Sequence, residues 1–211
     1  MVSDFELALQ ELSASDAQLT YRRLSMLSCP SREETVAFAA FWEGRDSQRR
    51  QQIISRMVEL AEERFELDFV DLFRYCLGDP NSEVRRLAIE GLWEAEGHDL
   101  AVTLSKMATT DPAVEVRSAA ASSLGRFLFM VECEELDERY AHMIREALET
   151  IITNPNESIE VVRRAIESIA FINDDRVRRM IGEAYDHADA RMRQSAIFAM
   201  GRSADPIWSE T

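Results

Sequence analysis

Apolar residues recur at spacings of three and four along most of the chain, and no stretch alternates apolar and polar residues as a strand would. This period places one apolar stripe along each helix, so the pattern predicts an all-α protein of about a dozen helices. We expect long helices at residues 47–66 and 68–77. Three pairs with capping-box spacing predict shorter helices nearer the N-terminus: Ser3 with Glu6, Ser15 with Gln18, and Ser31 with Glu34.

Further helix starts are predicted by proline. Four of the five prolines follow Asp79, Asp111, Asn154 and Asp205. The Asp or Asn side chain can cap a helix and proline suits the first helical position, so each pair predicts a helix start.

An apolar-Arg-small-apolar signature follows the first three of these pairs and then recurs once more. Its four copies are Val84, Arg85, Ala88 and Leu92; Val116, Arg117, Ala120 and Leu124; Val161, Arg163, Ala165 and Ile169; and Met192, Arg193, Ala196 and Met200. The aligned alanines are separated by 32, 45 and 31 residues, which is typical of a two-helix repeat with one insertion.

These motifs resemble HEAT repeats, especially the bacterial branch described as phycobilisome-lyase-like. The third copy departs from the pattern, because Val162 occupies the expected arginine position and the arginine follows at Arg163. The resemblance implies an armadillo-type fold, a right-handed α-solenoid of antiparallel helix pairs. We expect residues 1–78 to form a divergent helical region packed on the solenoid. The repeats would occupy residues 79–110, 111–153, 154–187 and, incompletely, 188–211.

The second helix of each repeat is expected at residues 99–109, 137–153 and 174–187, and the resemblance implies that these helices line the concave face. Their apolar positions supply a buried stripe, which leaves polar positions facing outward. We expect six of these to form the partner-binding surface: Lys106, His142, Arg145, Glu149, Arg179 and Glu183.

The chain is strongly acidic, with 39 acidic and 24 basic residues and a formal net charge of -15. This charge repels phosphate backbones and anionic lipids, so neither a nucleic acid nor a membrane is the expected partner. The sequence has no run of about 18 apolar residues that would span a bilayer, and its N-terminus lacks the pattern of a secretory signal. Cys29, Cys76 and Cys133 are too far apart for a CxxC pair, so we expect a reducing, cytoplasmic location.

Residues that could carry chemistry are few. Arg85, Arg117, Arg163 and Arg193 could form an anion-binding row, but we favour a structural ladder with the capping aspartates between repeats. The histidines His98, His142 and His187 are isolated, and neither a nucleophile elbow nor a phosphate-binding glycine loop occurs. We therefore expect no catalytic residue, no cofactor and no metal. Several aromatic residues are expected in the core: Trp42, Trp93, Trp208, Phe38, Phe41, Phe65, Phe69 and Phe73.

The favoured function is that of a noncatalytic scaffold or adaptor that binds a protein or peptide on its concave face. The resemblance leaves a second function open, that of a subunit of a phycobilisome-lyase-like or other modifying enzyme. A HEAT-like DNA glycosylase is disfavoured, because it would need a basic concave face.

The C-terminal end of the chain has the start of a repeat without its second helix. The helix expected over residues 189–202 carries an apolar surface wider than one neighbouring repeat would cover. This surface comprises Met192, Ala196, Ile197, Phe198, Ala199 and Met200. We expect the chain to be an N-terminal fragment of a longer HEAT-repeat protein, or this end to be covered by self-association or by a partner.

Overall fold

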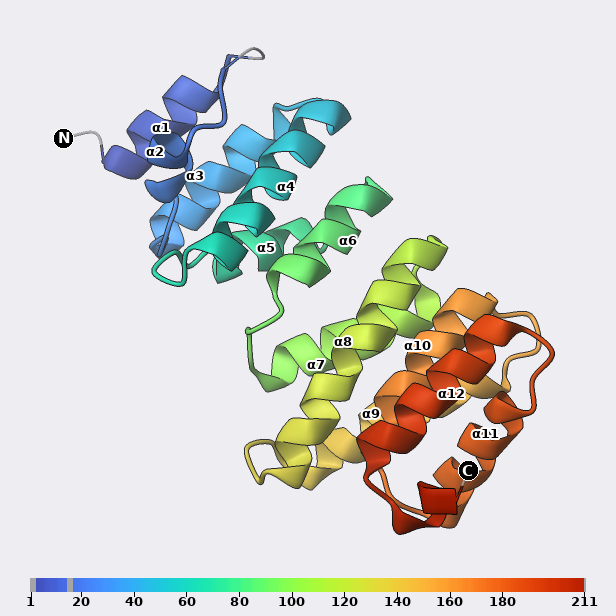
Figure 1. Ribbon diagram of the computed structural model, residues 1–211. Coiled ribbons are helices and arrows are strands. Elements are labelled where there is room, and N and C mark those ends of the chain that lie inside the picture. Colours follow the sequence, from blue (N-terminus) through green and yellow to red (C-terminus); the bar gives the residue numbers. More distant parts are fainter. Residues whose placement is uncertain (1–2, 15–16, 211) are drawn as a thin grey trace. The chain divides into compact units, whose positions relative to one another are not determined.

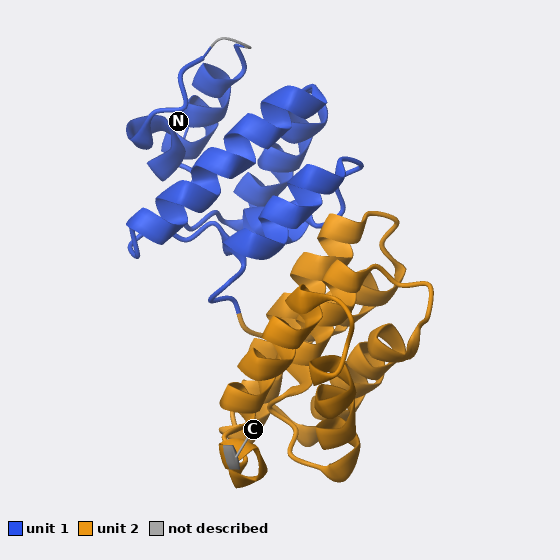
Figure 2. Ribbon diagram, turned by 45° about the vertical axis from the view of Figure 1, so that its right-hand side comes forward, with its two compact units in different colours: residues 1–95 blue, residues 96–211 orange. Residues whose placement is uncertain are grey.

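The computed structural model describes residues 3–14 and 17–210, and these residues form twelve α-helices and one 3-10 helix (Figure 1). The all-α fold predicted from the apolar period is therefore confirmed. The chain divides into two compact units, residues 1–95 and 96–211 (Figure 2).

Unit 1 contains the first six helices. They are α1 (Asp4–Leu12), α2 (Tyr21–Ser25), α3 (Arg32–Glu43), α4 (Ser47–Glu63), α5 (Val70–Cys76) and α6 (Ser82–Gly91). In this unit α1 packs on α2 and α3, while α6 packs on α4 and α5. Gly91 allows the α5–α6 contact, because a Cβ atom there would lie 2.6 Å from the ring of Phe73.

Unit 2 contains the remaining helices. They are α7 (His98–Thr110), α8 (Val114–Glu132), α9 (Glu138–Thr153), α10 (Ile159–Ile169), α11 (Asp175–Tyr185), α12 (Ala190–Ser203) and the 3-10 helix Pro206–Glu210. Helix α10 packs between α8 and α12, and these are the first helices of the repeats (Figure 1). The second helices α7, α9 and α11 agree closely with the ranges expected from the sequence, and α7 packs against α9.

The aligned alanines lie in the core, as a repeat signature requires. Ala88, Ala120, Ala165 and Ala196 are all fully buried. A small residue also allows close helix packing at Gly125 in α8, because a Cβ atom there would lie 3.0 Å from the Ser168 hydroxyl of α10. Small residues at these positions therefore let consecutive repeats approach each other.

The helix starts differ in detail from those expected. Ser3 and Ser31 form capping boxes with Glu6 and Glu34, as predicted. The proposed cap at Ser15 lies outside the described residues, while residues 17–20 are not helical and α2 begins only at Tyr21.

The residues before proline do not cap α6, α8 or α10. Asp79, Asp111 and Asn154 instead accept a hydrogen bond from the amide two residues later, which makes a turn that leads into the helix. The N-cap positions belong to Asn81, Ala113 and Ser158. The predicted helix starts are thus displaced by two to four residues toward the C-terminus.

Two aromatic residues expected in the core are exposed. Phe65 is 79% exposed and Trp93 is 46% exposed, whereas Phe38, Trp42 and Phe73 are buried. Both exposed residues follow the end of a helix, α4 and α6 respectively, so the helical period no longer determines which way they point.

The apolar surface expected on α12 is smaller than its sequence indicated. Met192, Ala196, Ala199 and Met200 are buried within unit 2, where α12 packs on α10 and α11. Ile197 and Phe198 remain 57% and 51% exposed, so self-association through this end stays a prediction.

Candidate functional site

The six residues predicted to bind a partner all lie on the second helices of unit 2. Lys106 is in α7, His142, Arg145 and Glu149 are in α9, and Arg179 and Glu183 are in α11. Four of them are exposed, while Arg145 and Glu149 are half-buried. The structure gathers only some of them into one site.

A charged groove of about 660 Å³ brings His142, Arg145 and Glu149 together. It extends over the C-terminal end of α8, most of α9 from Glu138 to Glu149, and the start of α11. Its full lining is Val131, Glu132, Glu138, Ala141, His142, Arg145, Glu146, Glu149, Ile172 and Arg176. Lys106 and Arg179 do not line it, because α7 contributes no residue and Arg179 is further along α11.

The basic side chains of this groove are held by acidic neighbours. Arg145 lies 2.8 Å from Glu149 and 2.5 Å from Asp174, and Arg176 lies 2.8 Å from the other oxygen of Glu149. The hydrogen bond to Glu149 raises the pKa of Arg145, and the contact with Asp174 adds to this. These ion pairs link α9 to α11 and leave Arg145 less available to a partner than its sequence position indicated.

Asp174 belongs to the same network and also caps α11. Its carboxylate accepts hydrogen bonds from the amides of Arg176 and Val177, both at 2.9 Å. Partial burial raises the pKa of Asp174, but these hydrogen bonds and the Arg145 charge outweigh burial and hold it below its usual range. The start of α11 is thus fixed against α9 by a cap and an ion pair together.

Three glutamates in the groove have no arginine partner within residues 3–14 and 17–210. Glu132, Glu138 and Glu146 are exposed, and among the described residues only His142 approaches any of them, at 3.9 Å from Glu146. Glu132 and Glu138 fall in the acidic run around residues 132–138 that the sequence displays, but sequence alone did not link that run to His142. The groove therefore presents unneutralised negative charge beside half-buried Val131, Ala141 and Ile172.

A second cavity of about 310 Å³ lies where the last turn of α9, the loop that follows it, α10, the second half of α11 and the start of α12 meet. We call it the apolar cavity because eight of its twelve lining residues are apolar, although polar side chains also line it. It includes Glu183, another of the six predicted residues. The rest of its lining is Ile152, Asn154, Pro155, Glu157, Ile159, Val162, Ile166, Met180, Ala184, His187 and Met192.

The signature arginines of unit 2 have structural partners. Arg117 and Arg193 each donate to two main-chain carbonyls of the loop before their own helix, those five and six residues earlier. Arg85 in unit 1 makes the same contacts to Asp79 and Pro80. Arg117 also pairs with the Glu157 carboxylate in the loop before α10, at 2.7 Å, so it links two consecutive repeats through a glutamate.

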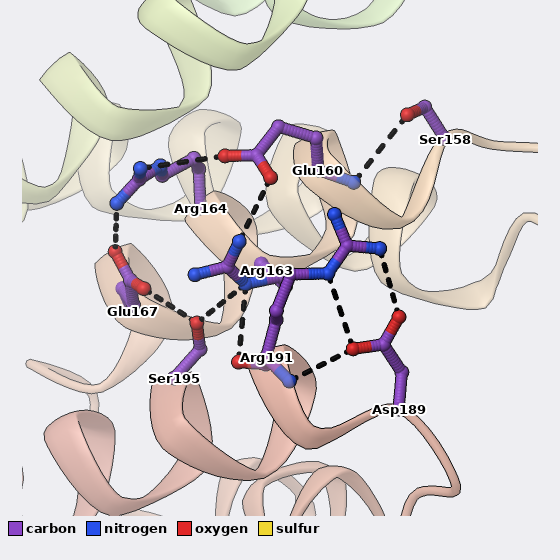
Figure 3. A network of polar contacts seen from close by, with 8 residues as sticks. All are labelled: Ser158, Glu160, Arg163, Arg164, Glu167, Asp189, Arg191 and Ser195. Atoms are coloured by element: carbon purple, nitrogen blue, oxygen red, sulfur yellow. Dashed lines mark hydrogen bonds and ion pairs between the residues drawn. The ribbon is translucent and has the colours of Figure 1, made fainter.

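Arg163, the shifted member of the set, contacts the next repeat through α12. Figure 3 shows its guanidinium between α10 and α12, where it donates to the Arg191 carbonyl at 3.1 Å and to the Ser195 hydroxyl at 3.0 Å. Ser195 in turn donates to Glu167 at 2.6 Å. A polar seam thus joins the two first helices at this point.

The three histidines do not meet. His98 stacks on Tyr140 with 4.5 Å between ring centroids, and His142 and His187 lie on different helices or loops. Within residues 3–14 and 17–210, no group of three His, Cys, Asp or Glu side chains is arranged to hold a metal ion. None of the described helices is both long and apolar enough to cross a membrane.

Comparison with known proteins agrees with this architecture. The family model of HEAT repeats matches residues 39–142, so the match includes residues N-terminal to Asp79 in which the sequence showed no repeat signature. No curated protein matches the chain. Among solved structures, a designed armadillo repeat protein in complex with the peptide (KR)4 is similar, with a TM-score of 0.55 and 16% identity over 93% of this chain and 98% of that one. The fold is therefore an all-α solenoid similar to that of HEAT and armadillo repeat proteins.

Proposed function

We propose that this protein is a noncatalytic scaffold that binds a basic, extended segment of another protein in the charged groove of unit 2. The observation that carries the proposal is the set of exposed carboxylates of Glu132, Glu138 and Glu146, which no arginine of the described chain neutralises. Arginine or lysine side chains of a partner would supply the missing positive charge.

The shape of the groove supports an extended chain as ligand. Its exposed carboxylates come from the end of α8 and from two positions of α9 that are eight residues apart, Glu138 and Glu146, so they are distributed along the groove. Half-buried Val131, Ala141 and Ile172 lie between them and can contact the aliphatic part of a lysine or arginine side chain.

Two further facts favour a basic partner. The net charge of -15 attracts cationic segments over a distance of about 8 Å at physiological salt. The similar designed armadillo protein was solved with the peptide (KR)4, which consists of basic residues. The same groove would also serve a subunit of a modifying enzyme, because such a subunit has to hold a protein substrate.

Fluorescence anisotropy with a labelled (KR)4 peptide tests the proposal. We expect saturable binding that weakens as salt is added, and a labelled (DE)4 peptide should not bind. The double substitution Glu138→Gln and Glu146→Gln should weaken binding about five- to tenfold, since two charge-assisted contacts are lost.

A matched control removes two exposed glutamates from unit 1, Glu62→Gln with Glu63→Gln. This variant has the same net charge as the groove variant and should bind almost as tightly as the original protein. Equal weakening by both double variants would mean that the peptide responds to overall charge, and the groove would then not be the site.

A further inference from the structure

The charged groove and the apolar cavity lie along the same pair of helices, in a fixed order. Arg145 and Glu149 of α9 face Asp174 and Arg176 at the start of α11. Further along both helices, Ile152 and Met180 line the apolar cavity. Residue numbers thus increase in the same direction along α9 and α11. On α9 the charged groove reaches Glu149 and the apolar cavity begins at Ile152, and on α11 the groove is at Arg176 and the cavity begins at Met180.

The apolar cavity is suited to a side chain from outside. Its volume is about 310 Å³, whereas a cavity of about 150 Å³ already admits a benzene-sized group. Ile166, Met180 and Met192 are buried and supply apolar surface. The polar members of the lining are at its rim: Asn154, Glu183 and His187, which are exposed, and Glu157, which is half-buried. An aliphatic or aromatic side chain that enters would exchange water for apolar contacts.

We infer that one partner segment occupies both sites at once, and that this segment carries an apolar anchor residue at a set distance from a basic residue. This inference rests on the proposed function, to which it adds the second anchor and the spacing. Without the apolar anchor, the groove would select a basic segment by charge alone.

The spacing follows from helix geometry. Glu146 of the charged groove and Ile152 of the apolar cavity are six positions apart on α9, which corresponds to about 9 Å along the helix axis. An extended peptide advances about 3.3 Å per residue. The basic and apolar residues of the partner should therefore be about three positions apart.

A peptide series tests the spacing without altering the protein. Labelled peptides would carry two arginines and one leucine in a Gly-Ser background, with the leucine one, three or five positions from the nearer arginine, in both chain directions. We expect tightest binding at a separation of three in one direction. Replacing that leucine by alanine should weaken binding about tenfold, and a separation of one should weaken it similarly.

A protein variant tests whether the leucine of the peptide enters the apolar cavity. Val162 is half-buried in the cavity lining, and Val162→Phe should fill part of the space. The variant should lose affinity for the leucine peptide but bind the alanine peptide as the original protein does, provided that its melting temperature shows it to be folded. Should it unfold, the peptide series alone decides the inference.

The outcomes separate this inference from the proposed function. If the peptides bind through Glu138 and Glu146 but leucine and its position have no effect, the bipartite site is wrong while the basic-segment site stands. If no basic peptide binds, both are wrong. A leucine effect that depends on spacing but is unchanged in a folded Val162→Phe variant would place the anchor elsewhere and overturn the assignment.

Discussion

The guanidinium of Arg117 in α8 forms two hydrogen bonds to the carboxylate of Glu157 in the loop before α10, at 3.1 Å from Nε and 2.7 Å from Nη2. Both side chains are largely buried, with 15% and 7% of their surfaces exposed. Because Arg117 also donates to the loop before its own helix, one side chain ties two successive repeats together.

This pair predicts a pH dependence of stability. Burial raises the pKa of Glu157, but the hydrogen bonds from Arg117 and the Ser158 amide, with the Arg117 charge, outweigh burial and lower it. A carboxyl whose folded pKa is lowered stabilises the protein above its unfolded value of about 4.3, and the contribution disappears as pH falls through the folded value.

Glu157→Gln should therefore reduce the free energy of unfolding by about 1.5–3 kcal/mol at pH 7, and by much less at pH 3. Urea denaturation of both proteins at the two pH values measures the difference. Glu132→Gln, at an exposed position, should have little effect at either pH. A Glu157→Gln effect that is the same at pH 3 and pH 7 would contradict the ionic origin of the stabilisation.

The surroundings of two helical glycines predict opposite effects on stability when each is replaced by alanine. Gly125→Ala would place a methyl group 3.0 Å from the Ser168 hydroxyl and 3.2 Å from its Cα atom, so we expect a loss of about 1–3 kcal/mol. Gly182→Ala in α11 meets no atom within 4 Å and should stabilise by about 0.5–1 kcal/mol through helix propensity. Thermal melting of the two variants checks this, and stabilisation by both would mean that α10 shifts readily to admit the methyl group.

Burial of the aligned alanines predicts that Ala120→Asp strongly destabilises unit 2. Ala120 is fully buried in α8, and a carboxylate there without a partner costs several kcal/mol. Ser122→Asp on the exposed side of the same helix provides a matched control with the same new charge. Circular dichroism melts should separate the two variants, and equal melting temperatures would argue against the buried position of Ala120.

The double role of Asp174 can be divided by two substitutions. Asp174→Ala removes the cap of α11 and the contact with Arg145, and should cost about 2 kcal/mol. Asp174→Asn keeps an oxygen that can accept the amide hydrogen bonds, so we expect about half of that cost. Urea denaturation distinguishes the two, and an equal loss would show that the charge rather than the cap stabilises this helix start.

Much of the fold could be predicted because it depends on local periodicity. The boundaries of α7 and α9 and the burial of Ala88 and Ala120 follow from the spacing of apolar and small residues. The sequence also determined the acidic character of the chain and the repeat length. Where a segment leaves the helical period, as at Phe65, the pattern no longer indicates which side is buried.

Which residues form the candidate site could be seen only in the tertiary structure. A shift of one position turns a side chain by about 100° around its helix, so Arg163 reaches α12, whereas Arg117 and Arg193 both donate to the loops before their own helices. In the same way, only packing brings Glu132 from α8 beside His142 and Glu146 of α9, and sets Arg176 against Glu149. The sequence by itself determined the helices and their charge, whereas the approach of residues distant along the chain decided which charges are paired and which stay exposed without an arginine partner among the described residues.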